Sequence, residues 1–189
     1  MQVATACMGL WATLSDPTDV AVYAHRRAQQ NGEFFDTSLY PAMCTICKTS
    51  VHGGSKHCGF CNRCVQSFDH HCKWLNNCIG QGNYRLFLVL IGILFCSELA
   101  FCIAALLFLG RSGEDSFREN CERYAGWDCQ GLAIALVAFA LLVAALVVFG
   151  LANLIGLHVW LRKYKKMTTY EYIISKRRAA KYRDTVLPT

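Results

Sequence analysis

The chain has 189 residues and a formal net charge of +6, from 19 Lys and Arg against 13 Asp and Glu. Hydrophobic residues make up 54% and charged residues only 17%, whereas globular domains average about 25% charged residues. This composition disfavours both an ordinary soluble domain and a disordered tail.

The N-terminal region is apolar at first and polar afterwards. Residues 1–14 are too short to cross a bilayer, and they lack the basic start and the cleavage site of a signal peptide. We therefore expect either an interfacial helix or the end of a span whose beginning is missing. Residues 15–43 begin near an Asp-Pro pair, contain an Asn-Gly pair and are polar, so we expect a loop-like cytosolic linker.

Cysteine and histidine are concentrated in residues 44–85, which hold seven of the twelve Cys and four of the six His. The pattern C-x2-C-x9-H-x6-C occurs there twice, and the second copy is displaced by 14 residues. Each copy supplies three thiolates and one imidazole, a common ligand set for a tetrahedral structural zinc. The predicted ligands are Cys44, Cys47, His57 and Cys64 at one site, and Cys58, Cys61, His71 and Cys78 at the other.

The two ligand sets overlap along the chain, so the two sites must interleave. Spacing alone leaves open an exchange of partners, such as Cys61 with Cys64. Hairpins of this length are too small to bury a core, so the metals would supply much of the folding free energy. The block therefore predicts a zinc-stabilised domain of short hairpins and loops.

One thiol is left over by this repeat. Cys72 would begin a third copy, but the next ligand position is Leu75. Asp69 and His70 precede this thiol, and His70 also lies outside the zinc pattern. A cysteine becomes a nucleophile when a neighbouring base favours its thiolate, and a carboxylate can orient that base. Asp69, His70 and Cys72 are therefore candidate catalytic residues; the alternative is a structural thiol beside a spare surface histidine.

Two later segments have the length and composition of membrane spans. Residues 86–109 carry one charge, Glu98, and residues 131–161 include 26 consecutive residues without any charge. At 1.5 Å per residue, each is long enough to cross a hydrocarbon core of about 30 Å. Two core helices of a soluble protein are the alternative, which is disfavoured because nothing else in the chain could form a shell around them. His158, near the end of the second span, is expected at the interface.

Charge on the flanking segments predicts the orientation. The tail of residues 162–189 has nine Lys and Arg up to residue 183, whereas the loop of residues 110–130 has three, against five acids. The positive-inside rule places the tail in the cytosol and the loop outside or in a lumen, which returns the Cys/His block to the reducing cytosol. Cys121 and Cys129 of the loop could form a disulfide. The fold class predicted is an α-helical integral membrane protein with two complete transmembrane helices and a cytosolic zinc domain.

The motif Asp69-His70-His71-Cys72 in this Cys-rich frame resembles the DHHC protein S-acyltransferases, or palmitoyltransferases. The resemblance continues through Trp74, the run Asn77-Cys78-Ile79-Gly80, Asn83 and Phe87. Two flanking motifs are similar as well: Thr168-Thr169-Tyr170-Glu171 matches the family's Thr-Thr-x-Glu, and Asp16-Pro17-Thr18 matches its Asp-Pro-Gly with Thr in place of Gly. Together the similar positions cover about residues 10 to 175.

The resemblance implies a reaction. Cys72 would attack a long-chain acyl-CoA such as palmitoyl-CoA and would pass the acyl group on to a cysteine of a protein substrate at the cytosolic face. His70 would act as the base, oriented by Asp69, and His71 would bind zinc. Two structural zinc ions and acyl-CoA as cosubstrate follow from the family, and the acyl chain would lie among transmembrane helices and membrane lipids.

Family members usually have four spans, so this chain looks like one that lacks the first two, with residues 1–14 as the end of the second. A Golgi or endoplasmic reticulum membrane is the expected location. The alternatives are a membrane-tethered zinc-binding adapter or an inactive truncated form. Nucleic-acid binding is disfavoured by the two spans and by only four basic residues between Cys44 and Cys78.

Overall fold

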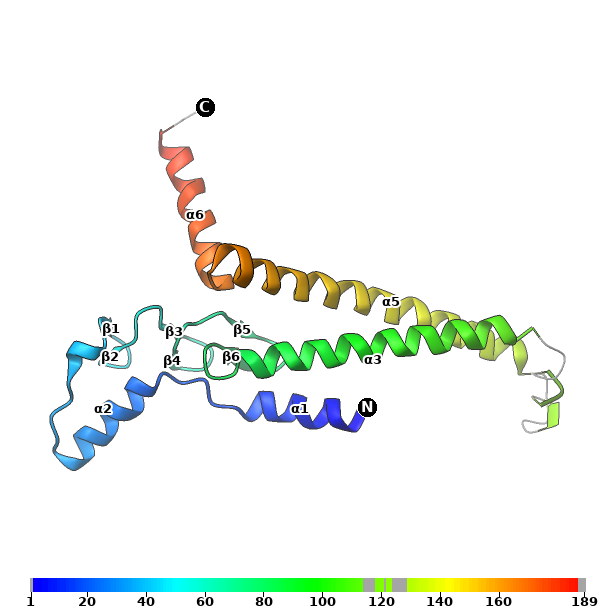
Figure 1. The fold of residues 1–189 in the computed structure, drawn as a ribbon, viewed down its shortest axis with the longest axis horizontal. Coiled ribbons are helices and arrows are strands. Elements are labelled where there is room, and N and C mark those ends of the chain that lie inside the picture. Colours follow the sequence, from blue (N-terminus) through cyan, green and yellow to red (C-terminus); the bar gives the residue numbers. More distant parts are fainter. Residues whose placement is uncertain (1, 114–117, 121, 124–128, 187–189) are drawn as a thin grey trace. The chain divides into compact units, whose positions relative to one another are not determined.

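The computed structural model describes residues 2–113, 118–120, 122–123 and 129–186. Figure 1 shows its elements in chain order: α1 (Gln2–Leu14), α2 (Val20–Asn31), the short η1 (Thr37–Leu39), the strands β1 (Ala42–Cys44), β2 (Thr49–Val51), β3 (Lys56–Cys58), β4 (Arg63–Val65), β5 (His70–Cys72) and β6 (Asn77–Ile79), then α3 (Tyr84–Arg111), α5 (Gln130–Trp160), η2 (Leu161–Lys165) and α6 (Thr169–Val186). The chain divides into two compact units. Residues 6–90 and 157–189 form one, and residues 1–5 and 91–156 form the other.

Three antiparallel hairpins, β1–β2, β3–β4 and β5–β6, form the centre of the first unit. Their first strands start at residues 42, 56 and 70, so the 14-residue period of the sequence is also the period of the structure. The third hairpin keeps this period even though its ligand pattern stops at Leu75. The backbone repeat thus extends one copy further than the metal-binding pattern.

The three hairpin turns also share one backbone conformation. Lys48, Asn62 and Asn76 occupy equivalent positions and have φ values of 52°, 47° and 44°. Strands of three residues bury little apolar surface. The largest fully buried side chains on these strands are Val65 and Ile79, at equivalent positions of β4 and β6. With so small a core, other cross-links must hold the hairpins together.

Residues 20–31, which were expected to be loop-like, instead form α2. Its N-cap is Asp19, whose carboxylate accepts a hydrogen bond from the Ala21 N–H at 2.9 Å, and its C-terminus is closed by Gly32 at φ 70°. The expectation was wrong because it followed the polar composition and overlooked the caps and the run of Ala, Arg and Gln, all good helix formers or helix-compatible residues.

The same Asp19 attaches α2 to the first hairpin. Its side chain is fully buried and accepts hydrogen bonds from the His52 backbone N–H at 3.0 Å, from His52 Nδ1 at 2.7 Å and from the Ser55 hydroxyl. Its backbone N–H donates to the Cys64 carbonyl at 2.8 Å. One residue therefore starts the helix and joins it to the hairpins.

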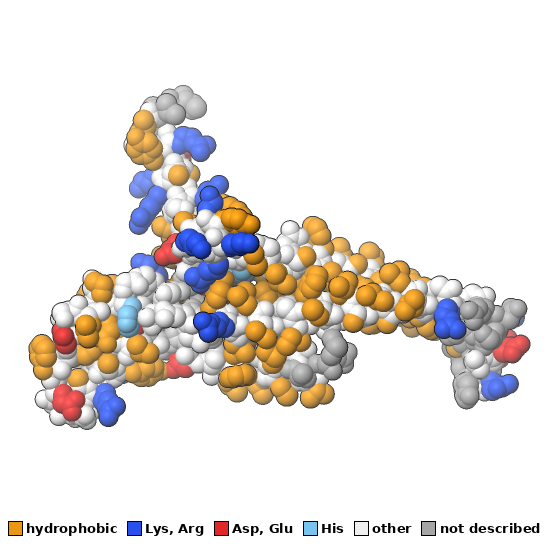
Figure 2. All heavy atoms as spheres, in the orientation of Figure 1, with side chains coloured by type: hydrophobic (Ala, Val, Ile, Leu, Met, Phe, Trp, Pro, Cys, Tyr) orange, Lys and Arg blue, Asp and Glu red, His pale blue; other side chains and the backbone are white. Residues whose placement is uncertain are grey.

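Two helices among the described residues are long and apolar enough to cross a membrane: α3 with 28 residues, and α5 continued by η2 with 36. Only 22% and 6% of their most apolar stretches are buried within the structure, so they do not resemble core helices of a soluble protein. Figure 2 shows hydrophobic side chains on the surfaces of both helices. These helices, with the motifs above, point to a membrane protein.

Within the unit of residues 1–5 and 91–156, Glu98 lines a groove of about 490 Å³ between α3 and α5, together with side chains that include Phe101 and Phe139. Where α3 ends and α5 begins, the Gln130 side-chain amide donates to the Ser112 carbonyl at 2.7 Å. The hypothesis of a Cys121–Cys129 disulfide depends on a residue, Cys121, that lies outside the described part of the chain.

In the other unit, the end of α5 passes through the π-helical turn η2 to Lys166, which has φ 55°. The helix α6 follows and buries none of its side chains. Lys and Arg side chains project along it (Figure 2).

Candidate active site and metal centres

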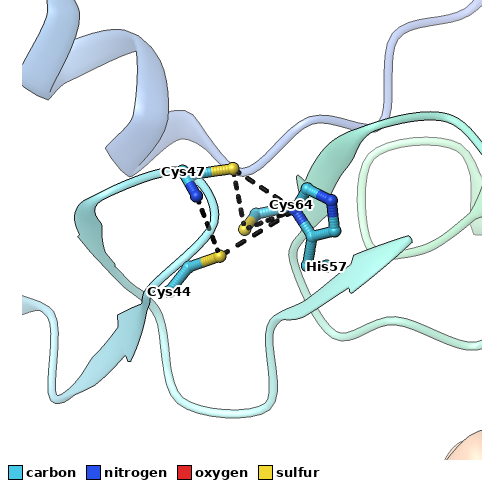
Figure 3. A group of neighbouring side chains, drawn as sticks. All are labelled: Cys44, Cys47, His57 and Cys64. Atoms are coloured by element: carbon cyan, nitrogen blue, oxygen red, sulfur yellow. Dashed lines mark hydrogen bonds between the residues drawn. The ribbon is translucent and has the colours of Figure 1, made fainter. Parts of the chain in front are cut away.

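The first predicted metal site is assembled from two successive hairpins. Cys44 ends β1 and Cys47 lies in the turn that follows, and His57 and Cys64 come from β3 and β4 (Figure 3). His57 Nδ1 lies 3.8, 3.4 and 3.9 Å from the sulfur atoms of Cys44, Cys47 and Cys64. The sulfur atoms of Cys47 and Cys64 are 3.5 Å apart.

The second site repeats this arrangement one hairpin later. His71 Nδ1 lies 3.8, 3.4 and 3.7 Å from the sulfur atoms of Cys58, Cys61 and Cys78, and the sulfur atoms of Cys61 and Cys78 are 3.3 Å apart. The structure therefore groups the eight residues in the two sets that the spacing predicted, without an exchange of partners.

Both groups fit zinc. Ligands about 2.3 Å (sulfur) and 2.0 Å (nitrogen) from a tetrahedral zinc lie about 3.5–3.8 Å from one another. The measured separations of 3.3 to 3.9 Å agree with this geometry, and no described carboxylate belongs to either group. Thiolate and imidazole donors without carboxylates favour zinc over magnesium or calcium. A zinc at each site would cross-link one hairpin to the next.

Asp69, His70 and Cys72 lie together at the start of the third hairpin. Asp69 precedes β5, His70 opens it and Cys72 ends it. The Asp69 carboxylate, 1% exposed, lies 2.8 Å from His70 Nδ1. That contact fixes the imidazole orientation and leaves its other nitrogen for the thiol of Cys72, which is 8% exposed. The spacing of the sequence is thus matched by a carboxylate–imidazole–thiol arrangement.

The surroundings favour charge on all three groups. Burial disfavours protonation of His70, but hydrogen bonds to Asp69 and Cys72, and the charges of both, raise its pKa to about 9. Burial also opposes ionisation of Cys72, yet the hydrogen bond from His70 and those from the Leu75 and Trp74 amides lower its pKa. For Asp69, burial is outweighed by hydrogen bonds, the strongest from His70, so its pKa is lowered. Both pKa shifts therefore favour the imidazolium–thiolate form of the pair over the neutral form.

The turn after Cys72 resembles the turns that follow the zinc-site cysteines. Backbone amides two and three residues later donate to Cys44 and to Cys58, as they do to Cys72. At Cys44 this includes the Cys47 N–H, 3.3 Å from the sulfur. The third hairpin thus keeps a turn that stabilises a sulfur anion, and Leu75 stands where the second metal ligand would be.

Residues far along the chain complete the site. The Thr169 backbone N–H donates to Asp69 Oδ1 at 3.1 Å, and Arg162 Nη2 lies 3.6 Å from the same oxygen. His158 Nδ1 lies 3.0 Å from the Tyr84 hydroxyl oxygen and 4.0 Å from Asp69 Oδ2. The carboxylate of Asp69 is therefore the common contact of β5, the end of α5 and the start of α6.

Three of these residues were not found from the sequence. The sequence placed His158 only near the end of a span; in the structure it is 2% exposed, and its ring lies 5.8 Å from that of His70 and 5.2 Å from that of Phe87. No sequence pattern marked Tyr84 or Arg162 as site residues. In the structure the Arg162 guanidinium stacks 4.1 Å from the Tyr84 ring centroid. Only Thr169 had a sequence signal, because it lies in the Thr-Thr-x-Glu motif.

Comparison with known proteins agrees with the motifs. The family model described as DHHC palmitoyltransferase matches residues 38–176. The chain is also 34% identical over 192 residues to the human protein Palmitoyltransferase ZDHHC11, an alignment that covers 89% of this chain and 46% of the human protein. The chain thus spans about half the length of this relative.

Proposed function

Because the chain belongs to the DHHC palmitoyltransferase family, we propose that it transfers a palmitoyl or similar long-chain acyl group from acyl-CoA to a cysteine of a protein substrate, through an acyl-Cys72 intermediate. Family members are palmitoyltransferases, and the membrane location follows from the two apolar helices. A Golgi or endoplasmic reticulum membrane, with the zinc domain in the cytosol, is part of the proposal.

In the first half-reaction the Cys72 thiolate attacks the thioester carbonyl carbon of acyl-CoA. The tetrahedral intermediate collapses, its bond to the CoA sulfur breaks, and the protonated His70 gives its proton to the leaving CoA thiolate. Asp69, 2.8 Å from His70 Nδ1, holds the imidazole in place and stabilises its charge. The products are free CoA and the acyl thioester of Cys72, with His70 neutral.

In the second half-reaction His70 accepts the proton of a substrate cysteine. The resulting thiolate attacks the acyl-Cys72 carbonyl, the bond to the Cys72 sulfur breaks, and Cys72 leaves as a thiolate beside the imidazolium. The enzyme returns to its starting charge state. One histidine therefore serves as acid in one step and as base in the other.

Zinc bound at the two Cys/His sites would supply structure rather than reaction chemistry, because all four ligand positions at each site are filled by protein. The proposed roles of the eight ligands are therefore to hold the hairpins, including the one that bears Cys72. No step of the transfer involves them directly.

The observation that carries this proposal is the arrangement of Asp69, His70 and Cys72 on a hairpin whose thiol belongs to neither metal group. An adapter without acyl transfer would have no use for this set of residues. Incubation of the purified 189-residue chain with a clickable palmitoyl-CoA tests the difference. We expect a hydroxylamine-sensitive label on the protein itself.

The label should be lost in Cys72→Ser with both zinc ions retained, and kept in Cys96→Ser, which removes an exposed cysteine of α3 that belongs to neither metal group. Zinc-replete protein without any label would favour the adapter or an inactive form. Loss of zinc from Cys72→Ser would show that the thiol is a metal ligand.

A further inference from the structure

A buried side chain of the β5–β6 hairpin, which bears Cys72, forms hydrogen bonds to the C-terminal end of α1. Asn77 lies on β6 directly opposite Cys72 and is 3% exposed. Its amide nitrogen Nδ2 lies 3.0, 3.2 and 2.7 Å from the carbonyl oxygens of Ala12, Thr13 and Ser15. Carbonyls at the C-terminus of a helix have no partner within the helix, so Asn77 satisfies them from outside.

Asn83 supports the same junction. Its side-chain amide, also buried, donates to the Ser15 hydroxyl at 3.1 Å and to the Cys78 carbonyl at 2.9 Å. The Asn77 side-chain oxygen accepts a hydrogen bond from the Cys78 N–H at 2.9 Å. Two amide side chains therefore join residues 12–15 to the strand that pairs with the strand bearing Cys72.

Only a carboxamide meets these requirements at position 77. The group must donate to carbonyl oxygens with its nitrogen and accept a backbone N–H with its oxygen. An aspartate has almost the same shape, but it would set an oxygen against three carbonyl oxygens in a buried place, which is costly. The contact is thus specific in chemistry as well as in shape.

We propose that Asn77 is a positioning residue for acyl transfer, because it fixes the Cys72 hairpin to the end of the apolar helix α1. This inference rests on the proposed function. It also extends the catalytic unit to residues 12–15, which precede the segment matched by the family model. The sulfur must meet a thioester whose chain lies in an apolar phase, and misplacement by about 1 Å can cost about 100-fold in rate.

The test is Asn77→Asp in the full chain, with Asn76→Asp as the matched control. Asn76 is the exposed neighbour and undergoes the same chemical change. Three quantities are measured: zinc content, the rate and KM of acyl-enzyme formation with palmitoyl-CoA, and amide hydrogen exchange of residues 10–15.

For Asn77→Asp we expect two zinc ions, an unchanged KM, a rate at saturating palmitoyl-CoA at least about tenfold lower, and faster exchange of residues 10–15. Asn76→Asp should behave as wild type. An unchanged rate with faster exchange would overturn the positioning role, because the tether would then be a helix cap alone. Unchanged exchange would overturn the tether itself.

If Asn77→Asp loses zinc, Ser15→Ala decides, because it removes the hydroxyl that accepts a hydrogen bond from Asn83 and donates one to the Ala12 carbonyl at 2.8 Å. This residue lies far from the metal ligands in sequence. The variant should slow acyl-enzyme formation about two- to fivefold with both zinc ions present, and an unchanged rate would overturn the inference. Failure of wild type to be labelled would overturn the proposed function, while hydrogen exchange would still decide whether the tether exists.

Discussion

His70 and His71 are adjacent imidazoles with different partners. His70 contacts Asp69 and Cys72, whereas His71 lies among three cysteine sulfurs. The difference follows from the alternation of side chains along β5, because neighbouring residues of a strand point to opposite faces. The two residues should therefore fail differently when they are replaced.

His70→Ala should slow acyl-enzyme formation about 10²- to 10⁴-fold, the usual effect of removing an acid–base group, with two zinc ions retained. Because the lost imidazole favours the thiolate, alkaline pH should restore part of the rate by ionising Cys72 directly. The measurement is labelling rate against pH, with zinc content determined on the same samples. Loss of metal from this variant would reverse the assignment of the two histidines.

His71→Ala should release one zinc and unfold the third hairpin, since one of four ligands is removed. Labelling should be lost, and alkaline pH should not restore it, because the defect is in the fold rather than in the ionisation of a thiol. Elemental analysis and proteolysis of the Cys/His block would measure this. Two zinc ions per chain in His71→Ala would contradict the assignment.

Residue types and spacing were enough to predict which Cys and His side chains group together and that Asp69 lies beside His70, because these contacts arise within a hairpin or between successive hairpins. They could not predict the contacts of Asp69 with His158, Arg162 and Thr169, which are about 90 to 100 residues away along the chain. Such contacts depend on where the ends of α3 and α5 meet the hairpins. The sequence around a single histidine at the end of an apolar segment does not predict which distant carboxylate that histidine contacts.

Among the hairpins, the tightest backbone approach is at Gly80, directly after β6. A Cβ atom there would lie 2.4 Å from Val65 Cγ1 and 2.8 Å from the Gln66 carbonyl oxygen, and the backbone oxygen cannot move aside without shifting a strand. Gly80→Ala should therefore destabilise the Cys/His block by about 1–3 kcal/mol. Thermal unfolding monitored by zinc release would measure this loss.

Gly59→Ala is the matched control, because a Cβ atom at that exposed position has no atom within 4 Å. It should change the zinc-release temperature little. Equal temperatures for Gly80→Ala and wild type would mean that the two hairpins lie further apart than in the structure.

The segment before α2 is attached to the second hairpin through Asp16. Burial disfavours ionisation of Asp16, but hydrogen bonds from Thr18 and Tyr23, and the charge of Arg63, lower its pKa to about 2. Since the unfolded value is 3.8, the stabilisation is complete above about pH 4 and is lost only as the pH falls toward 2.

Asp16→Asn should lower the unfolding temperature, and the difference from wild type should be the same at pH 7.5 and pH 5.5. The expected loss is about 1 kcal/mol, because the carboxylate is half exposed and solvent screens its ion pair. A difference that shrinks between these two pH values would show that the carboxylate titrates at a higher pH than its contacts imply.

At the level of elements, α3 and α5 could be predicted from composition alone, because a long apolar run leaves few other structures open to it. The helix α2 could not be predicted from its polar composition alone, since its sequence signals are the caps Asp19 and Gly32. The burial of the Asp19 carboxylate against His52 and Ser55 depends on the first hairpin. The capture of α1 by Asn77 was likewise not predictable, because it joins residues more than 60 positions apart.

Across the whole molecule, the two Cys/His groups connect three hairpins in series, so zinc ions bound to them would not be equivalent. The first site joins β1–β2 to β3–β4, and the second joins β3–β4 to the hairpin bearing Cys72. Cys44→Ser and Cys58→Ser should each lose one zinc. Cys58→Ser should lose at least about tenfold more acyl-enzyme label, since it releases the hairpin that positions the thiol.

Acyl-enzyme label and zinc content measured on both variants would test whether Cys58→Ser loses more label than Cys44→Ser. Equal loss of label would mean that the hairpins fold as one cooperative block.

Full removal of zinc by a chelator should abolish labelling while most of the helical circular dichroism remains, because α3 and α5 do not depend on metal.

Two Cys/His groups link the three hairpins, so the turn of the third hairpin has no further hairpin to be linked to. Each Cys/His group takes one residue from the end of a strand, one from the turn that follows it and two from the strands of the next hairpin. After the third turn and β6, the chain enters α3 at Tyr84. Arg85 and Gly92 stand where another copy would place its imidazole and its last thiolate. The start of the helix therefore acts like chain termination in a polymer, and the Cys72 thiol is the end group that belongs to neither Cys/His group.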